Sequence, residues 1–167
     1  SHILGICGVC DEAIGMLLSH KSNDDFIKGN PAYSINRLLL TLDERLRNRI
    51  KLQCQGREEV GIYQKKLAQY KNHFSKYCYK GSVVSLYLQF LEVYGKTYYI
   101  DMAPVAEQVA RGVFDVYDIA AMLIIYYRTL HRKPDEEFGQ IFIDEAQDFG
   151  PIVYYALRTV LPECFFT

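Results

Sequence analysis

Apolar residues recur at helical spacing through most of this chain. The longest such run follows Pro31 and places its apolar residues three or four positions apart, with charged residues between them: Ile35, Leu38, Leu39, Leu42, Leu46 and Ile50. This period predicts an amphipathic helix of about five turns, and proline suits its first turn because the ring restricts φ. A second run, from Arg57 to Tyr77, predicts another helix. Together the two runs predict an antiparallel helical hairpin.

Shorter periodic segments lie on either side of this hairpin. Asp11 to His20 predicts a short helix, and the polar stretch Lys21 to Asn30 predicts a loop. Gly81-Ser82 can cap a third helix that ends at Gly95, and a β-prone run from Thr97 to Ile100 follows.

Two further helices are predicted before the C-terminal segment. Pro104 can start a small helix that ends at Gly112, and Asp115 can cap a strongly apolar helix from Val116 to Leu130. An apolar stripe on the second helix is expected in the core: Ile119, Leu123, Tyr126, Tyr127 and Leu130.

The pattern changes from helix to strand at Gly139. Ile141-Phe142-Ile143 is short, β-branched and aromatic, which is typical of a buried strand in a parallel sheet. Pro151 to Leu161 then predicts a helix, and Cys164 to Phe166 predicts a last strand. Because that strand reaches Thr167 with no loop after it, we expect the chain to be a piece of a larger domain.

The composition is that of a folded protein. Half of the 167 residues are hydrophobic, 14% are aromatic, and 19 basic side chains stand against 20 acidic ones. These values exclude a disordered chain, and no segment approaches the ~20 apolar residues that cross a bilayer. We therefore expect a soluble, cytoplasmic protein with no membrane partner.

Cysteine usage points to reduced thiols, because five cysteines make a poor disulfide framework. Cys7 and Cys10 form one close pair, whose spacing fits a redox dithiol, half of a zinc site, or free thiols near a helix start. The rest of a zinc site would have to come from scattered residues: His20, Cys54, His73, Cys78 and Cys164.

The sharpest chemical signal is Asp144-Glu145, directly after the Ile141-Phe142-Ile143 run. A carboxylate held at the end of a strand can hold Mg²⁺ near nucleotide phosphates, and a neighbouring carboxylate can polarise an attacking water as general base. Two adjacent acids also occur as ordinary solvated loop residues, so the pair alone does not assign this chemistry.

The longer string Ile141-Phe142-Ile143-Asp144-Glu145-Ala146-Gln147-Asp148-Phe149 is far more specific. It resembles motif II, the Walker B element, of the superfamily 1 helicases related to UvrD, Rep and PcrA. The resemblance implies that Asp144 is the Mg²⁺ ligand, Glu145 the catalytic base, and Gln147 the link from the γ-phosphate to nucleic-acid-binding motifs. Asp148 matches the closing acid of the motif. ATP and Mg²⁺ are the implied cofactors of the full-length protein.

The resemblance covers about residues 114–167. Phe114 to Leu123 is similar to the helix that precedes motif II in these helicases, and Pro151 to Thr167 is similar to the helix and strand that lead to motif III. Within the superfamily, the Asp-Glu-Ala-Gln-Asp-Phe string and Tyr117-Asp118-Ile119-Ala120 look most like the HelD branch, whose members act on RNA polymerase.

The sequence departs from the family pattern in its lack of a Gly-x-x-x-x-Gly-Lys-Thr phosphate loop. The nearest string is Gly95-Lys96-Thr97, but Phe90 stands where the loop needs its first glycine, and a helical pattern precedes it. Motif III and the arginine motifs of a second motor domain are missing too. We therefore expect the chain by itself to be inactive in ATP hydrolysis.

Charge is divided unevenly along the chain. Residues 37–80 carry eleven basic and four acidic side chains, whereas residues 101–167 carry five basic and eleven acidic ones. The resemblance places an accessory subdomain in the basic region, which implies DNA, or RNA polymerase, as its partner. The candidate phosphate contacts are Arg45, Arg47, Arg49, Lys51, Lys65 and Lys66. The alternative is a solvated helix face whose tyrosines pack inward.

The expected fold class is α/β: a mostly helical fragment of a RecA-like P-loop NTPase domain, with a helical insertion and a few parallel strands near the C-terminus. Its expected parts are an N-terminal helical segment (1–36), a basic insertion (37–113) and the Walker B part (114–167). Exposed strand edges are expected to let the fragment self-associate. The alternatives are a non-catalytic binding module for nucleic acid or RNA polymerase that retains the Walker B sequence, and a small nucleic-acid-binding helical protein.

Overall fold

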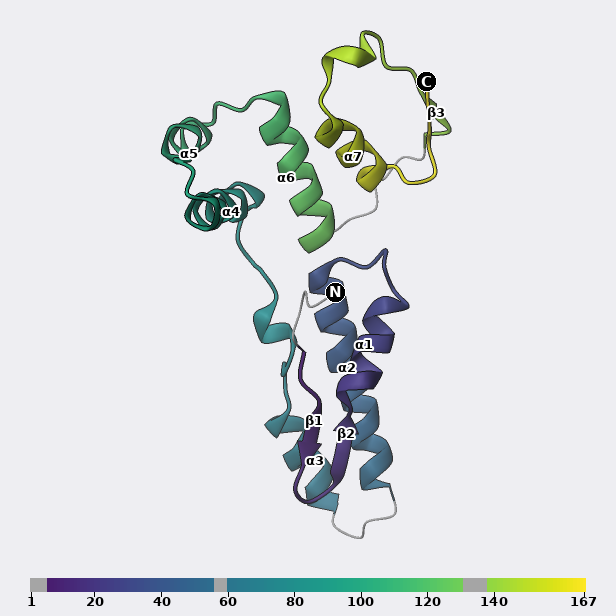
Figure 1. Cartoon of the computed structure of the whole chain (residues 1–167). Coiled ribbons are helices and arrows are strands. Elements are labelled where there is room, and N and C mark those ends of the chain that lie inside the picture. The colour runs from purple at the N-terminus through teal and green to yellow at the C-terminus, as the bar shows by residue number, and fades with distance from the viewer. Residues whose placement is uncertain (1–5, 56–59, 131–137) are drawn as a thin grey trace. The chain divides into compact units, whose positions relative to one another are not determined.

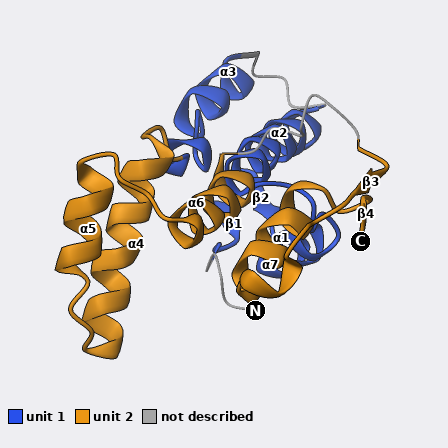
Figure 2. Cartoon of the chain, turned by 90° about the horizontal axis from the view of Figure 1, so that it is seen from above, with its two compact units in different colours: residues 1–78 blue, residues 79–167 orange. Residues whose placement is uncertain are grey.

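The computed structural model describes residues 6–55, 60–130 and 138–167. The chain forms two compact units, residues 1–78 (unit 1) and 79–167 (unit 2), which have different colours in Figure 2. The described residues form seven α-helices and four short strands, and the structure is 61% helical (Figure 1). The mostly helical character with a few short strands, expected from the sequence, is confirmed.

Unit 1 opens with a β-hairpin. β1 (Val9–Asp11) pairs antiparallel with β2 (Gly15–Leu18). The helix predicted for Asp11 to His20 is therefore wrong. The turn explains the difference, because Gly15 takes a φ of +82° and the Asp11 carboxylate accepts two backbone N–H groups of the turn, at 2.9 and 3.1 Å. Both features favour a turn over a continuous helix.

α1 (His20–Lys28) occupies the stretch Lys21 to Asn30, where the sequence predicts a loop, so that prediction is wrong as well. Ser19 starts the helix by accepting the N–H of Ser22 at 3.1 Å. The polar composition is misleading here because only one side of this short helix packs inward, where Asn23 is fully buried.

The long helix predicted after Pro31 is confirmed as α2 (Ile35–Cys54), which begins after the cap residue Ser34. Its predicted apolar stripe faces the core, where Ile35 is partly buried and the other five are buried: Leu38, Leu39, Leu42, Leu46 and Ile50. The second helical run is shorter than predicted and consists of α3 (Val60–Gln69) and, after a turn, η1 (Ser75–Tyr77). Its predicted start at Arg57 lies outside the described residues. The hairpin, α2 and Phe74, the residue before η1, contribute buried residues to one core, and α3 packs against it.

Unit 2 begins with α4 (Val83–Tyr98), which Ser82 caps as predicted. The helix continues past Gly95, so the β-prone run predicted for Thr97 to Ile100 is wrong. Gly95 instead allows the chain to turn back closely against the end of the helix. A Cβ atom at this position would lie only 2.7 Å from the carbonyl oxygen of Ile100. A glycine that permits this approach looks like a helix stop in the sequence alone.

α5 (Ala103–Ala110) and α6 (Val116–Thr129) confirm the two helices predicted next. Asp115 starts α6 in a capping box with Asp118, in which each carboxylate accepts the other residue's backbone N–H. The buried Asp118 carboxylate also accepts the Tyr87 hydroxyl at 2.7 Å, which ties α6 to α4. Burial, together with this hydrogen bond, raises the pKa of Tyr87 above its ordinary value.

The apolar stripe predicted to be the core face of α6 is wrong at two positions. Ile119 and Leu123 are exposed, while Asp118, Ala120 and Met122 are buried. α6 is apolar on nearly every side, so its period alone could not select the inward face. Contacts with two neighbouring helices, α4 and α7, make that selection.

The C-terminal part contains two strands with a helix between them. β3 (Gln140–Ile141), η2 (Ala146–Asp148), α7 (Pro151–Val160) and β4 (Phe165–Phe166) follow one another. β3 and β4 pair in parallel, as the sequence predicts. α7 packs beside α6, and Figure 1 shows β3 on the side of α7 away from α6.

The two compact units do not coincide with the segments proposed from the sequence. α4 and α5 belong by sequence to the expected insertion 37–113, yet they pack in the same unit as α6. The functional division into 1–36, 37–113 and 114–167 stays a prediction. In the three described ranges, no helix has the length and apolar character needed to span a bilayer.

Candidate functional site

The acidic string follows the end of β3. Beyond the two residues of β3 itself, Thr167 donates its N–H to Ile141 at 3.0 Å and Ile143 donates its N–H to Thr167 at 2.8 Å. Parallel pairing therefore continues to Ile143, and Asp144 is the next residue. The structure thus places Asp144 and Glu145 at the carboxyl end of a parallel strand.

The turn that carries these acids has an unusual backbone conformation. Glu145 takes φ 49° and ψ 39°, in the left-handed region, which costs a non-glycine residue about 1–2 kcal/mol. Two hydrogen bonds hold the turn: the Asp144 carboxylate accepts the Glu145 N–H at 2.9 Å, and the Glu145 carbonyl accepts the Asp148 N–H at 2.9 Å. The Gln147 side-chain amide also donates to the Glu145 carboxylate.

All four candidate site residues lie together in this turn and are exposed: Asp144, Glu145, Gln147 and Asp148. The turn presents three carboxylates and one amide to solvent within five consecutive residues. That arrangement can accept hydrogen bonds from water and can bind a hydrated cation.

α7 supports the turn from behind. The hydroxyl of Tyr154, in the second turn of α7, donates to the carbonyl oxygen of Ala146, between Glu145 and Gln147. At the start of α7, Gly150 lies against Tyr117 of α6, since a Cβ atom at Gly150 would come within 2.9 Å of the Tyr117 ring. The turn is therefore connected to the helices of unit 2.

The strands also attach to α7. The Arg158 guanidinium donates to the carbonyl oxygen of Cys164 at 2.8 Å and lies over the Phe166 ring, with 4.6 Å from Cζ to the ring centre. Phe142 and Phe165, however, are each 74% exposed. The prediction of a buried strand is thus wrong: Phe142 is exposed and Ile141 and Ile143 are only half-buried, because the described sheet has just two strands to cover them.

The donor set fits Mg²⁺ bound together with a nucleotide. Among the described residues, no three His, Cys, Asp or Glu side chains gather into a metal site. Mg²⁺ needs no such cluster, because it usually keeps several waters and is held by one or two carboxylates plus substrate phosphates. Asp144 is exposed, and the hydrogen bond from Glu145 orients its carboxylate.

The string Gly95-Lys96-Thr97 has no phosphate-loop conformation. All three residues lie inside α4, where the Lys96 ammonium pairs with Glu92 at 2.6 Å and the Thr97 hydroxyl donates to the Val93 carbonyl at 2.7 Å. A phosphate loop needs backbone N–H groups that converge on an anion, and those of a helix interior are used within the helix.

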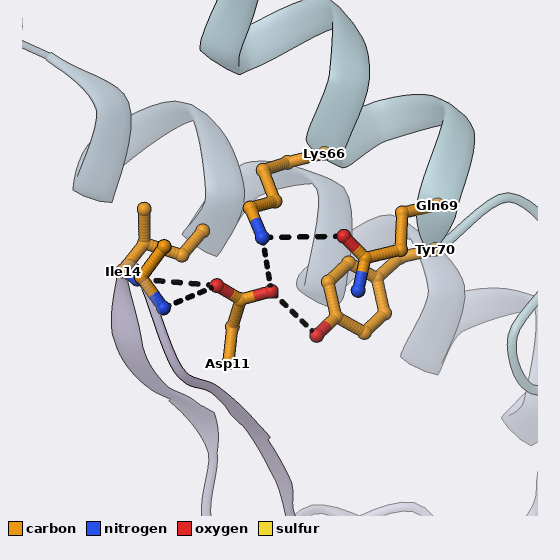
Figure 3. A network of polar contacts seen from close by, with 6 residues as sticks. Asp11, Ile14, Lys66, Gln69 and Tyr70 are labelled. Carbon is orange, nitrogen blue, oxygen red and sulfur yellow. Dashed lines mark hydrogen bonds and ion pairs between the residues drawn. The ribbon is translucent and has the colours of Figure 1, made fainter.

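Lys66 is one of the six basic residues proposed to contact nucleic acid, but it serves a different purpose. Its ammonium group lies 2.7 Å from the buried carboxylate of Asp11, and its side chain is only 17% exposed. Tyr70 donates its hydroxyl to the same carboxylate oxygen at 2.8 Å, and Gln69 contacts the ammonium at 3.2 Å (Figure 3). Lys66 is therefore unsuited to phosphate binding, which corrects that prediction.

This network, which we name the Asp11 network (Asp11, Lys66, Gln69 and Tyr70), shifts two pKa values. Burial alone raises the pKa of Asp11, but hydrogen bonds from Lys66, Tyr70 and two backbone N–H groups outweigh it and lower the value to about 2. Burial and the hydrogen bond to Asp11 raise the pKa of Tyr70 to about 12. The network thus joins the β-hairpin to α3 and the residue after it through an ionised carboxylate.

The other basic candidates divide into two groups. Arg45 is half-buried, donates to the Ser22 hydroxyl at 3.1 Å, and lies 4.5 Å from the ring centre of Phe26. Its guanidinium is therefore largely engaged with α1. The remaining four are exposed: Arg47, Arg49, Lys51 and Lys65.

The redox and zinc interpretations of the Cys7 and Cys10 pair stay predictions. Cys7 and Cys10 are exposed and form no disulfide, and Cys164 is buried. The residues suggested for the other half of a zinc site do not assemble with them into a metal-binding group in the described part of the chain.

Comparisons of this chain with family models, with curated proteins and with solved structures give no match. The assignment of the acidic turn therefore depends on its own geometry and on the motif in the sequence.

Sequence reasoning missed Tyr154 and Asp11. A tyrosine within an apolar helical stripe reads as core packing, although its hydroxyl needs a hydrogen-bond partner when partly buried. The only signal for Asp11 in the sequence was an acid next to an apolar segment. Its partners Lys66 and Tyr70 are 55 and 59 residues away along the chain, so no local pattern connects them with it.

Proposed function

We propose that this chain supplies the Mg-ATP hydrolysis carboxylates of a superfamily 1 helicase or translocase. The observation that carries the proposal is the placement of the Asp144-Glu145 pair at the carboxyl end of a parallel strand, where α/β nucleotide-binding proteins bind their ligands. The Asp-Glu-x-Gln-Asp string at this place supports the choice of ATP and Mg²⁺.

In this proposal each residue of the turn has a separate task. Asp144 holds Mg²⁺ directly or through water, and Glu145 accepts the proton of the attacking water. The Gln147 amide, which donates to Glu145 here, is the group that senses the γ-phosphate. Bound Mg²⁺ neutralises the charge that develops on the phosphates.

The chain does not carry all the groups that this reaction needs. Phosphoryl transfer depends on a phosphate cradle and on cations around the γ-phosphate, and Gly95-Lys96-Thr97 lies within a helix. We propose that a longer protein supplies those groups, and that the chain by itself does not hydrolyse ATP.

Magnesium dependence tests the assignment of Asp144. In the longer protein that carries this chain, Asp144→Asn removes the charged Mg²⁺ ligand while preserving an acceptor for the Glu145 N–H. We expect the Mg²⁺ concentration for half-maximal ATP hydrolysis to rise at least about tenfold, because hard cations prefer carboxylates. A Mg²⁺ titration of the hydrolysis rate measures it.

The matched control is Glu163→Gln, which neutralises an exposed acid between α7 and β4. We expect its Mg²⁺ dependence to equal that of the unmodified protein. If Asp144→Asn behaves in the same way as this control, Asp144 is not the metal ligand.

A second candidate function is DNA binding by unit 1. The observation that favours it is the exposure of Arg47, Arg49 and Lys51 along the second half of α2. Arg47 and Lys51, four residues apart, lie on the same side of the helix and can contact neighbouring phosphates, with an affinity that falls as salt rises.

Salt-dependent titration with a labelled DNA duplex tests this second function. Neutralising the three α2 cations together (Arg47→Gln, Arg49→Gln, Lys51→Gln) should lower the slope of log affinity against log salt by up to about three. Lys96→Gln, an exposed lysine of unit 2, should leave the slope unchanged. Binding that is absent, or insensitive to salt, contradicts this function.

A further inference from the structure

The acidic turn depends on a contact from outside its own segment. Within η2, the backbone hydrogen bond from the Phe149 N–H to the Ala146 carbonyl is long, at 3.4 Å. The same carbonyl oxygen also accepts the Tyr154 hydroxyl from α7. The tyrosine therefore adds a second donor, from a separate helix, to a carbonyl whose own backbone hydrogen bond is long.

α7 is itself held in place by packing, so it keeps the Tyr154 hydroxyl in a defined position next to the turn. Ala156 is buried, and α7 packs along α6. Arg158 connects the far end of the helix to β4 through Cys164 and Phe166. β4 in turn pairs in parallel with β3, the strand that leads into the turn. α7 is therefore connected to the turn through both strands.

Ala146 lies between two of the residues whose side chains the proposed reaction uses, Glu145 and Gln147. Glu145 is in the left-handed region, a conformation that persists only where surrounding contacts determine it. Without the Tyr154 hydrogen bond, the peptide between Ala146 and Gln147 loses its restraint from α7, and the Glu145 carboxylate loses part of what fixes its direction.

We propose that Tyr154 is a positioning residue for Glu145: its hydroxyl holds the Ala146 carbonyl and thereby the left-handed turn that aims the catalytic carboxylate. This inference rests on the proposed function. Tyr154 itself does not contact substrate, so its loss should affect the rate of the chemical step and not nucleotide binding.

Tyr154→Phe tests the inference, because it removes only the hydroxyl and keeps the ring that packs in unit 2. In the longer protein that carries this chain, we expect kcat for ATP hydrolysis to fall by about ten- to a hundredfold, the range that small misplacements of a catalytic group produce. KM for ATP and the Kd of a non-hydrolysable ATP analogue should stay within about twofold.

Tyr155→Phe is the matched control. Tyr155 is the next residue on α7, is exposed, and its hydroxyl accepts from Arg128 at 3.3 Å, away from the turn. We expect unchanged kcat and KM for this variant. Amide hydrogen exchange adds a readout independent of activity: peptides that cover residues 144–149 should exchange faster in Tyr154→Phe and at the normal rate in Tyr155→Phe.

The outcomes separate the inference from the proposed function. If the unmodified protein hydrolyses ATP, Glu145→Gln abolishes it and Tyr154→Phe keeps a normal kcat, the positioning role is wrong and the proposed function stands. Normal exchange of residues 144–149 in Tyr154→Phe also overturns the role. A protein without ATP hydrolysis overturns both. Equal thermal unfolding of the two variants confirms that loss of folding is not the cause of a lower kcat.

Discussion

Glu145→Gln, made in the longer protein that we propose for this chain, is expected to reduce ATP turnover by about a hundred- to ten-thousandfold, the range that general-base catalysis contributes. Glutamine has the same shape and can still accept a hydrogen bond from Gln147, but it cannot take a proton from water. Nucleotide binding should stay within about threefold, because Glu145 acts on the attacking water and not on the phosphates.

Single-turnover hydrolysis and equilibrium binding of ATP in the presence of Mg²⁺ are the measurements for this variant. Glu163→Gln serves as the control, since it makes the same chemical change at an exposed acid outside the turn. If turnover in Glu145→Gln matches that in Glu163→Gln, the role assigned to Glu145 is wrong, and the acidic turn is an ordinary solvated loop.

Asp11→Asn is expected to destabilise unit 1 by about 3–5 kcal/mol. The substitution leaves the partly buried ammonium of Lys66 without its counterion and the Tyr70 hydroxyl without its charged acceptor. Urea unfolding followed by circular dichroism measures the change. Asp25→Asn, at an exposed position of α1, should change the free energy of unfolding by less than about 0.5 kcal/mol.

A double-mutant cycle identifies the cause of this destabilisation. Lys66→Met replaces the lysine with an uncharged, apolar side chain of similar length. If the pair interacts as the structure indicates, the double variant Asp11→Asn, Lys66→Met should lose less free energy than the two single variants combined. Additive losses would show that the 2.7 Å ion pair contributes little to the stability of unit 1.

The pH dependence of stability has a defined sign for each group of the Asp11 network. The folded state lowers the pKa of Asp11 from 3.8 to about 2, so this contribution is fully present above pH 3.8 and is lost as the pH falls toward 2. The folded state raises the pKa of Tyr70 from 10.0 to about 12, so that contribution is lost as the pH rises through this interval. Asp11→Asn should abolish the loss of stability that Asp11 causes as the pH falls from 3.8 toward 2.

Local signals in the sequence were sufficient for most helices and for the acidic turn. Ser82 and Asp115 predicted their helix starts because a cap acts through hydrogen bonds to residues two or three positions away. The strand before Asp144 was predictable from three consecutive apolar residues, and its parallel partner from a second such run after one helix. These features depend on neighbours in the chain, so the amino-acid order alone contains them.

Contacts between distant residues decided the rest. The buried carboxylate of Asp11 binds Lys66 and Tyr70, which are 55 and 59 residues away along the chain, and this contact removes Lys66 from the phosphate-binding candidates. The inward face of α6 was chosen by α4 and α7, since the helix is apolar on nearly every side. The sequence by itself determined that Glu145 follows a strand. Its left-handed conformation was decided by the tertiary structure, because the tyrosine that braces the next residue projects from a separate helix.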